Sequence, residues 1–239
     1  MKSGNFLLND VEAIAAAPQS TRDAVIPSLE VEFATSQDAW TKQEVATSLV
    51  RLGDKDDTYW NFLVALAIPA AEDDAPFPVQ VDQNGHFAKK PSPDFVRWAA
   101  DRHLELGDAL EHETLDVPGD IFDLGFTRDP RAVSILQMAL ASPNYLVEAA
   151  AAEGLAAMGN RASVPLIIEA CSRAPADAAA AIAMHLASFP GKDAQQAFDL
   201  YVPKDLQAAA RDEYSEENSQ GEGPQRDTNP STPPANPHP

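Results

Sequence analysis

The sequence predicts an all-α protein, folded as a right-handed α-solenoid of stacked helical hairpins. Three observations lead to this fold class. Apolar residues recur at helical spacing, the spacing repeats after about 30 residues, and glycine or proline residues separate the segments. A small β-hairpin or extended insertion interrupts the array, and the composition of the C-terminal end predicts a disordered tail.

The clearest hairpin begins with a helix over Leu146–Met158. This segment contains no proline and is dominated by alanine, leucine, methionine and glutamate, which are good helix formers. Ser142-Pro143 is expected to supply the N-cap and the first helical position. Gly159-Asn160 ends the helix, because these residues readily adopt left-handed backbone angles. The small side chains of Ala149–Ala152 allow neighbouring helices to approach closely.

The second helix of this hairpin follows at once. Ser163 is expected as its cap, and Pro165 is tolerated in the first turn. One face carries apolar residues at i, i+3, i+4 and i+7, namely Val164, Ile167, Ile168 and Cys171. At about 25 cal/mol per Å² of apolar surface, a single hairpin of this kind cannot offset its own ordering entropy. We therefore expect similar hairpins on both sides.

The sequence contains these copies. The apolar spacing of the second helix recurs 31 residues upstream and 30 residues downstream, and again near the front of the chain. The positions are Val133, Leu136, Gln137 and Leu140; Ala194, Ala197, Phe198 and Tyr201; and Tyr59, Phe62, Leu63 and Leu66. The first helix is echoed by Leu49 and Leu52, by Leu186 and Phe189, and by a weaker copy at Ile121 and Leu124. Two helices per unit at this period are typical of an α-solenoid.

Three stretches carry a family resemblance: "DPRAVSILQMAL" (129–140), "VEAAAAEGLAAMGNRASVPLIIEA" (147–170) and "VATSLVRLGDKDD" (45–57). They resemble HEAT repeats, and more particularly the short HEAT-like repeats first described in phycobilisome lyases. The resemblance covers residues 41–70 and 119–202. It implies the fold and leaves the function open, because the repeat residues encode packing.

The remaining segments complete the organisation. Residues 1–73 are expected to hold a helical cap and the first repeat, with Thr41 and Glu44 as a capping box. Residues 74–117 form the insertion, in which "FPVQVDQNGHFAKK" (77–90) has the Asn84-Gly85 hairpin pattern and a helix opening at Ser92-Pro93 carries Phe95, Trp98 and Leu104. This insertion either covers an edge of the solenoid or shapes a partner-binding ridge. Residues 118–213 hold the C-terminal repeats, and 214–239 the disordered acidic, proline-rich tail.

Charge and composition restrict the partners. The formal net charge is −20, from 37 acidic and 17 basic residues, which argues against a nucleic-acid partner. No apolar run reaches membrane-spanning length and no signal-peptide pattern opens the sequence, so we expect no membrane partner and a cytoplasmic location. An exported protein whose signal segment is missing from this sequence is the alternative.

Motifs for catalysis are missing from the sequence. It has no glycine-rich phosphate loop, nucleophile elbow or His-Glu-x-x-His motif. His112-Glu113 is its single His-Glu pair, and Asp54–Asp57 lacks the glycine and distal glutamate of a calcium loop. Cys171 lies on the apolar stripe, which favours a core position over a nucleophile or a bilin attachment point. We therefore expect no cofactor and no metal.

The functional hypothesis is a non-catalytic repeat scaffold that binds a protein or peptide. Gln137, Glu169 and Arg173 are candidate contact residues on the second helices, and Trp60, one position off the apolar stripe, is a candidate exposed anchor. Two alternatives stay open: a pigment-lyase-like or other enzyme built on the same repeats, and a structural spacer.

Overall fold

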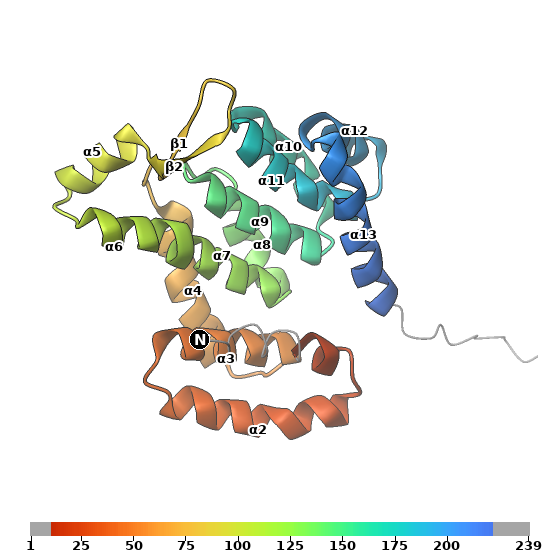
Figure 1. Ribbon diagram of the computed structural model, residues 1–239. Coiled ribbons are helices and arrows are strands. Elements are labelled where there is room, and N and C mark those ends of the chain that lie inside the picture. Colours follow the sequence, from red (N-terminus) through yellow and green to blue (C-terminus); the bar gives the residue numbers. More distant parts are fainter. Residues whose placement is uncertain (1–10, 222–239) are drawn as a thin grey trace, which may run out of the picture.

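The computed structural model describes residues 11–221, and the surroundings of the side chains from 11 to 212. Residues 11–15 are helical. The α-helices that follow are α2 (Gln19–Thr35), α3 (Ala39–Leu52), α4 (Asp57–Glu72), α5 (Pro93–Asp101), α6 (Leu106–Glu111), α7 (Val117–Phe126), α8 (Val133–Ala139), α9 (Tyr145–Ala157), α10 (Val164–Arg173), α11 (Ala176–Met184), α12 (Lys192–Tyr201) and α13 (Lys204–Gly221). Strands β1 (Val79–Val81) and β2 (Phe87–Pro91) form the sheet of this part of the chain. The all-α prediction is confirmed (Figure 1).

The helices stack as hairpins in two layers. Helices α3, α7, α9 and α11 pack on one another in succession, and their hairpin partners α4, α8, α10 and α12 form the second layer. The weak sequence copy at Ile121 and Leu124 lies on α7, and both residues are fully buried. The insertion therefore separates the first hairpin, α3–α4, from the second, α7–α8, and the two pack together through α3, α4 and α7.

The predicted apolar stripes form one continuous core. Leu136 and Ile167, at matching positions of α8 and α10, are fully buried, and Ala197, at the same position of α12, is 6% exposed. Cys171 is buried on the same stripe. The register read from the sequence is therefore confirmed for α8, α10 and α12. On α4 the buried face is rotated, because Trp60 and Ala67 are buried while Phe62 and Leu66 are only partly buried.

Two glycines set the distance between α7 and α9. A Cβ atom added to Gly125 would lie 2.6 Å from the Cα of Gly154, and one added to Gly154 would lie 2.7 Å from the Cα of Gly125. Leu136 closes on the same point, with its Cδ1 at 3.1 Å from that second position. The alanines of α9 predicted that a neighbouring helix would approach closely. The approach is closest at Gly125 and Gly154, where neither residue has a side chain to keep the two backbones apart.

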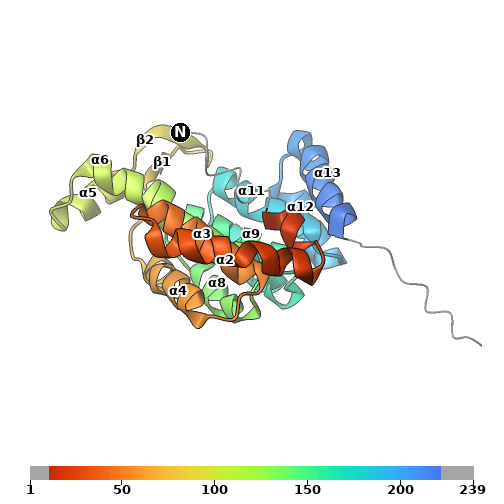
Figure 2. The same ribbon diagram turned by 90° about the horizontal axis from the view of Figure 1, so that it is seen from below.

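The N-terminal helix covers the first hairpin, as predicted. Helix α2 lies across α3 (Figure 2), and its Phe33 makes edge-to-face contacts with Tyr59 and Phe62, with ring centroids 5.0 and 5.4 Å apart. The predicted capping box is wrong. Asp38 caps α3 by accepting a hydrogen bond from the Thr41 amide at 2.7 Å, so Glu44 lies more than a turn inside the helix and is buried.

Two further helix starts differ from the prediction. Asn144, rather than Ser142, caps α9 and accepts from the Leu146 amide, while Ser142 Oγ accepts from the Asn144 amide. Ser163 precedes α10, but its hydroxyl donates to Asn160 Oδ1 and accepts from Gln137 instead of capping the helix. Asparagine caps as well as serine does, so composition alone could not choose between the neighbouring positions. The end of α9 is as predicted, with Gly159 at φ 62°.

The insertion contains the expected β-hairpin, with a longer turn than the two-residue loop predicted. The Gly85 amide donates to Asp82 O and the Asp82 carboxylate accepts from the Asn84 and His86 amides, so a five-residue loop (82–86) joins the strands. Gly85, at φ 85°, supplies the one left-handed residue of that loop. Short aspartate side chains often stabilise turns in this way, which the Asn-Gly pattern did not reveal.

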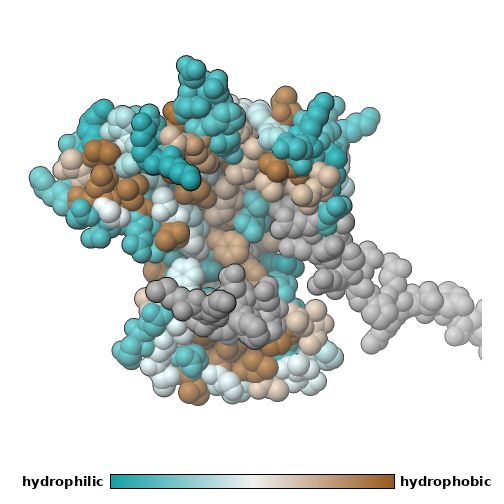
Figure 3. Space-filling view, viewed as in Figure 1, coloured by the Kyte–Doolittle hydropathy of each residue, from teal (hydrophilic) through white to brown (hydrophobic). Residues whose placement is uncertain are grey.

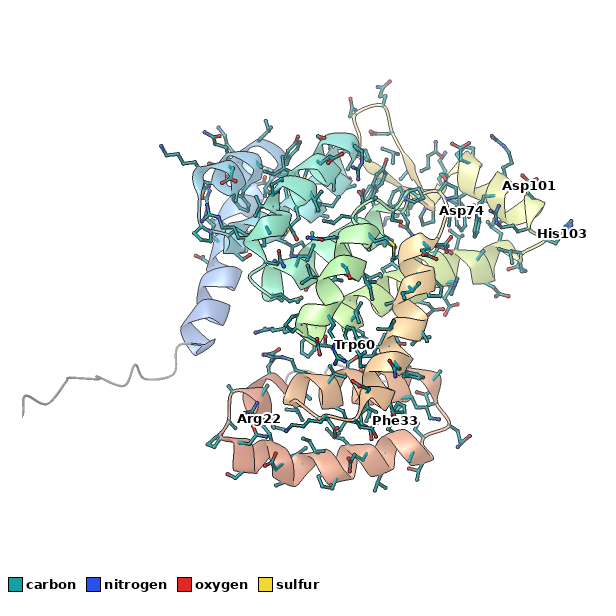
Figure 4. The ribbon with its side chains drawn as sticks, turned by 180° about the vertical axis from the view of Figure 1, so that it is seen from behind. Arg22, Phe33, Trp60, Asp74, Asp101 and His103 are labelled. Carbon is teal, nitrogen blue, oxygen red and sulfur yellow. The ribbon has the colours of Figure 1, made fainter. Side chains whose placement is uncertain are left out.

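The rest of the insertion is a projecting arm made of α5 and α6. Ser92 caps α5, as predicted, and Phe95 fills a small separate core with Ala99 and Ala109. Leu104 was expected on α5, but the helix ends at Asp101 and Leu104 is 46% exposed. Asp101 and His103 lie at the outer end of the arm (Figure 4), whose surface shows apolar side chains (Figure 3). The π-helix His112–Asp116 then leads into α7.

At the other end, α13 continues to Gly221 and crosses the predicted tail boundary at 214. Residues 214–221 are therefore helical rather than part of a disordered tail, since glutamate, serine and glutamine can extend a helix that tertiary contacts have begun. Residues 222–239 lie outside the described part. Across the described residues, no helix is long and apolar enough to cross a membrane.

Candidate functional site: the groove beneath the hairpin

The β-hairpin bends back over the repeats and leaves an open groove of about 640 Å³ beneath it. The groove lies between the insertion and the ends of α9 and α10. Its walls combine prolines, aromatic and aliphatic side chains with a few polar groups: Pro76, Phe77, Val79, Gln80, Val81, Ser92, Pro93, Asp94, Pro143, Tyr145, Arg173, Ala174 and Pro175. Residues that are almost 100 positions apart in the sequence thus line one surface.

The tip of the hairpin is fastened to the first turn of α11 by Asp177. One carboxylate oxygen accepts from the Phe87 amide at 2.8 Å, and the other lies 2.8 Å from Nδ1 of His86. In return the Asp177 amide donates to the Gly85 carbonyl at 3.1 Å. A side chain at Gly85 would strike Ala176, whose nitrogen lies 2.6 Å from the added Cβ. Gly85 therefore permits both the turn and the docking.

The base of the hairpin packs on the start of α9. The ring of Phe77 lies between Phe87 and Tyr145, with centroids 5.1 and 5.0 Å away. Ser92 Oγ donates to the Phe77 carbonyl at 2.9 Å and closes the base of the insertion. With both ends held, the hairpin forms an arch over the groove.

Arg173 supplies the positive charge of the groove. Its Nη2 donates to Glu148 Oε1 at 2.6 Å and to the Leu140 carbonyl at 2.7 Å, and its Nη1 lies 3.5 Å from Glu169. The Arg173 side chain remains 43% exposed, whereas that of Glu148 is 1% exposed. Burial raises the pKa of Glu148 to about 7, an effect that Arg173 opposes. One side of the guanidinium thus serves a buried ion pair that joins α9 to α10, and the other side faces the groove.

A family model matches this part of the chain. The PBS lyase HEAT-like repeat matches residues 147–173, which run from the first turn of α9 to the end of α10. A search of curated proteins and a search of solved structures gave no match. The Glu148–Arg173 ion pair therefore joins the two helices of the HEAT-like repeat, with Arg173 as its last matched residue.

The four predicted contact residues do not form one site. Arg173 lies in the groove, and Glu169 is exposed beside it on α10. Gln137 is half-buried, because its Nε2 donates to Ser163 Oγ at 2.9 Å and ties α8 to the HEAT-like repeat. Trp60 is 8% exposed, with the Arg131 guanidinium 4.3 Å from its ring, so it is not the exposed anchor expected (Figure 4). Being one position off the stripe placed Trp60 against Arg131 rather than in solvent.

Other candidate chemistry is also placed by the structure. The Cys171 thiol is 1% exposed, and burial raises its pKa to about 12, so it stays protonated and inaccessible at neutral pH. His112 is exposed and contacts Asp116 at 3.1 Å, while Glu113 is buried and contacts Asn144, so the His-Glu pair points in two directions. Within residues 11–221, no group of three or more His, Cys, Asp or Glu residues is arranged to hold a metal ion. In the segment Asp54–Asp57, Asp56 acts as the N-cap of α4.

Sequence reasoning missed the groove residues Phe77 and Tyr145, and it missed Asp177, which fastens the tip of the hairpin. Phe77 and Tyr145 carry no local pattern that separates them from ordinary packing residues. Asp177 has the ordinary interpretation of an acidic residue in the first turn of a helix. Only the return of the hairpin onto α9 and α11 brings the three together.

Proposed function

We propose that this chain is a non-catalytic HEAT-like repeat scaffold whose groove binds an extended segment of a protein partner. The observation that carries the proposal is the position of β1. All three of its residues line the groove, and in the described part of the chain β1 is paired on one edge alone. An extended segment can add to such an edge as a further strand.

The hydrogen-bond pattern of the hairpin gives the direction of the free edge. The Asp82 amide donates to His86 O and the Ser92 amide to Pro78 O, so the even-numbered residues face β2. Because hydrogen-bonded and non-bonded pairs alternate in an antiparallel ladder, Val79 and Val81 direct their amides and carbonyls away from β2. These are the groups that an added strand would pair with.

The walls of the groove favour a particular kind of segment. Phe77 and Tyr145 offer aromatic faces for apolar side chains, and the exposed side of Arg173 offers N–H donors. We therefore expect an extended, largely apolar segment that places a carbonyl or carboxylate oxygen against Arg173.

The alternative of a lyase-like enzyme has less support. A covalent pigment intermediate on this chain would need an accessible thiolate, and Cys171 is buried with a raised pKa. Metal analysis and a visible absorption spectrum of the purified protein test this alternative directly. Stoichiometric metal or an absorption band above the aromatic region would favour the enzyme and count against the proposal.

The proposal is tested by blocking the free edge. Val81→Pro removes an amide that faces the groove and leaves the bonds to β2 in place, because proline is tolerated at such an edge position. Gln83→Pro is the matched control, since proline is favoured at the second position of the turn that begins at Asp82. A partner captured from the source cell by the wild-type chain and the control, but lost with Val81→Pro, supports the groove. Capture that does not change with Val81→Pro refutes it.

A further inference from the structure

A second surface lies at the start of α3, on the body of the molecule away from the hairpin (Figure 1). Trp40, in the first turn of α3, is 51% exposed. Its ring lies against α7, where the nearest atom to a Cβ added at Gly119 is Trp40 Cζ3, at 3.9 Å. The indole N–H is beside the Glu44 carboxyl and partly offsets the rise in its pKa that burial causes.

Three carboxyl groups gather behind this tryptophan. Glu44 on α3 and Asp123 on α7 are 5% and 4% exposed, and Asp120 is half-buried and accepts from Gln43 Nε2 at 2.7 Å. Burial is the main cause that raises the pKa of all three, and the Glu44 and Asp120 charges raise that of Asp123 further, to about 7. Asp123 Oδ2 has no hydrogen-bond partner among the described residues.

These carboxyl groups have no cationic partner in residues 11–212. None of the ion pairs found there includes Glu44, Asp120 or Asp123. Of the neighbouring titratable groups, Asp38 raises the pKa of Glu44 and Asp116 raises that of Asp120. His112 lowers the pKa of Asp120, but it is itself paired with Asp116. A buried carboxylate without a partner is costly, so an added cation is favoured here.

The other two tryptophans of the chain show what is missing. The Arg102 guanidinium lies 4.8 Å from the ring centroid of Trp98, and Asp74 accepts from both Arg102, at 2.8 Å, and the Trp98 indole, at 3.1 Å. Around Trp60 the arrangement is similar. Arg131 lies 4.3 Å from the ring and pairs with Asp57 at 2.9 Å and with Asp129 at 2.7 Å. Among residues 11–212, Trp40 has the ring and the carboxyl groups of this arrangement but no arginine.

We propose that Trp40, Glu44 and Asp120 bind an arginine side chain of a protein partner, whose guanidinium takes the place that Arg102 and Arg131 occupy at the other two tryptophans. A planar guanidinium can stack on an indole and pair with a carboxylate at once, which an ammonium does less well. The net charge of −20 favours the approach of a basic segment. This site is separate from the groove and does not depend on the function proposed for it.

The test uses the indole N–H signals of the full-length chain in a ¹⁵N–¹H NMR spectrum. The chain has three tryptophans, and Trp→Phe variants assign the signals. The probe is acetyl-Gly-Arg-Gly-amide, and the same peptide with citrulline is the neutral, isosteric control. We expect a saturable shift of the Trp40 signal with an apparent Kd on the order of 1 mM, with the Trp60 and Trp98 signals unmoved. The citrulline peptide should give no such shift.

Two variants separate the site from general attraction to an acidic protein. Glu44→Gln keeps the shape of the buried side chain and should weaken the binding at least fivefold. Glu32→Gln removes the same charge from the exposed face of α2 and should leave it unchanged. The Trp60 and Trp98 signals report whether each variant is folded. The absence of a saturable Trp40 shift, equal shifts of all three signals, an equal response to citrulline, or full binding by Glu44→Gln would overturn the proposal.

Discussion

Replacing Gly125 with alanine should lower the stability of the repeat stack, whereas the same replacement at Gly119 should raise it. Both residues lie within α7, where alanine is the better helix former by about 1 kcal/mol. A Cβ at Gly119 meets only the Trp40 ring, at 3.9 Å, which is an ordinary contact. The gain from helix propensity is then retained.

At Gly125 the added Cβ would lie 2.6 Å from the Cα of Gly154, and no rotamer change can relieve a contact between backbones. Helices α7 and α9 must separate by a large part of an ångström, which loosens the contacts of the buried side chains around them. Overpacking of a core costs about 1–3 kcal/mol, and here it exceeds the gain in propensity. We expect a net loss of about 1–2 kcal/mol for Gly125→Ala and a net gain of up to about 1 kcal/mol for Gly119→Ala.

Thermal unfolding followed by circular dichroism measures both changes. For a chain of this size, 1 kcal/mol moves Tm by about 2–4 °C, so a difference of about 1–3 kcal/mol should separate the two variants by about 2–12 °C. A Gly125→Ala protein that is as stable as the Gly119→Ala protein would refute the close crossing of α7 and α9. It would also place the second and third hairpins in a different relation.

Three further predictions address the core, a buried charge and the hairpin. Ile167→Asp should unfold the HEAT-like repeat, because an unpaired charge at a fully buried site costs several kcal/mol. Leu166→Asp, at a 38% exposed position of the same helix, should leave it folded. Circular dichroism measures the helix content of both variants. The pKa of Asp123 is raised from 3.8 in the unfolded chain to about 7 in the native state, so the native state binds the proton more tightly. The free energy of unfolding should therefore fall as pH rises from about 4 to about 7. Asp123→Asn should remove this fall and, in urea unfolding at pH 8, be more stable than the wild type by up to about 4 kcal/mol. The Asp177 carboxylate raises the pKa of His86, so the stabilising ion pair is present at low pH and is lost as pH rises through the pKa of His86. An NMR titration should give a His86 pKa above 6.5, and this pKa should fall toward 6.5 in Asp177→Asn.

The repeat array could be predicted from the sequence because each repeat packs in the same way, which gives a periodic pattern of apolar residues. Each of the stripe residues Leu63, Leu136, Ile167 and Phe198 must be apolar for the same reason, so one period predicts all of them. Helix ends were less certain where two capping residues lie close together, as at Ser142 and Asn144. There the choice depends on tertiary contacts: the Asn144 amide group also donates to the Glu113 carbonyl, 31 residues away.

The candidate site was predictable only in part. Arg173 and the hairpin were each identified as candidates, but their meeting at one groove depends on how the insertion bends back. That direction is fixed by Asp177 at the tip and by Tyr145 at the base, and neither residue carries a local signal for it. The interpretation of Trp60 failed for a related reason. Its position off the predicted stripe suggested exposure, but Trp60 belongs to the main core, and Arg131 from the next repeat lies against its ring.

Both proposed binding surfaces lie where the repeat period is broken. Within the repeats, the polar residues of the second helices are largely engaged in internal contacts, since Gln137 bonds to Ser163 and Arg173 holds Glu148. These bonds hold helices of the array together, and of the two side chains only Arg173 keeps an exposed side that can meet a partner. The insertion adds a strand edge that the array itself does not have, and the start of α3 adds a half-exposed tryptophan with carboxyl groups behind it. The outer edge of β1 is unpaired in the described residues and Trp40 is half-exposed, so variants that weaken binding at Val81 or Glu44 are expected to leave the folding of the repeats intact.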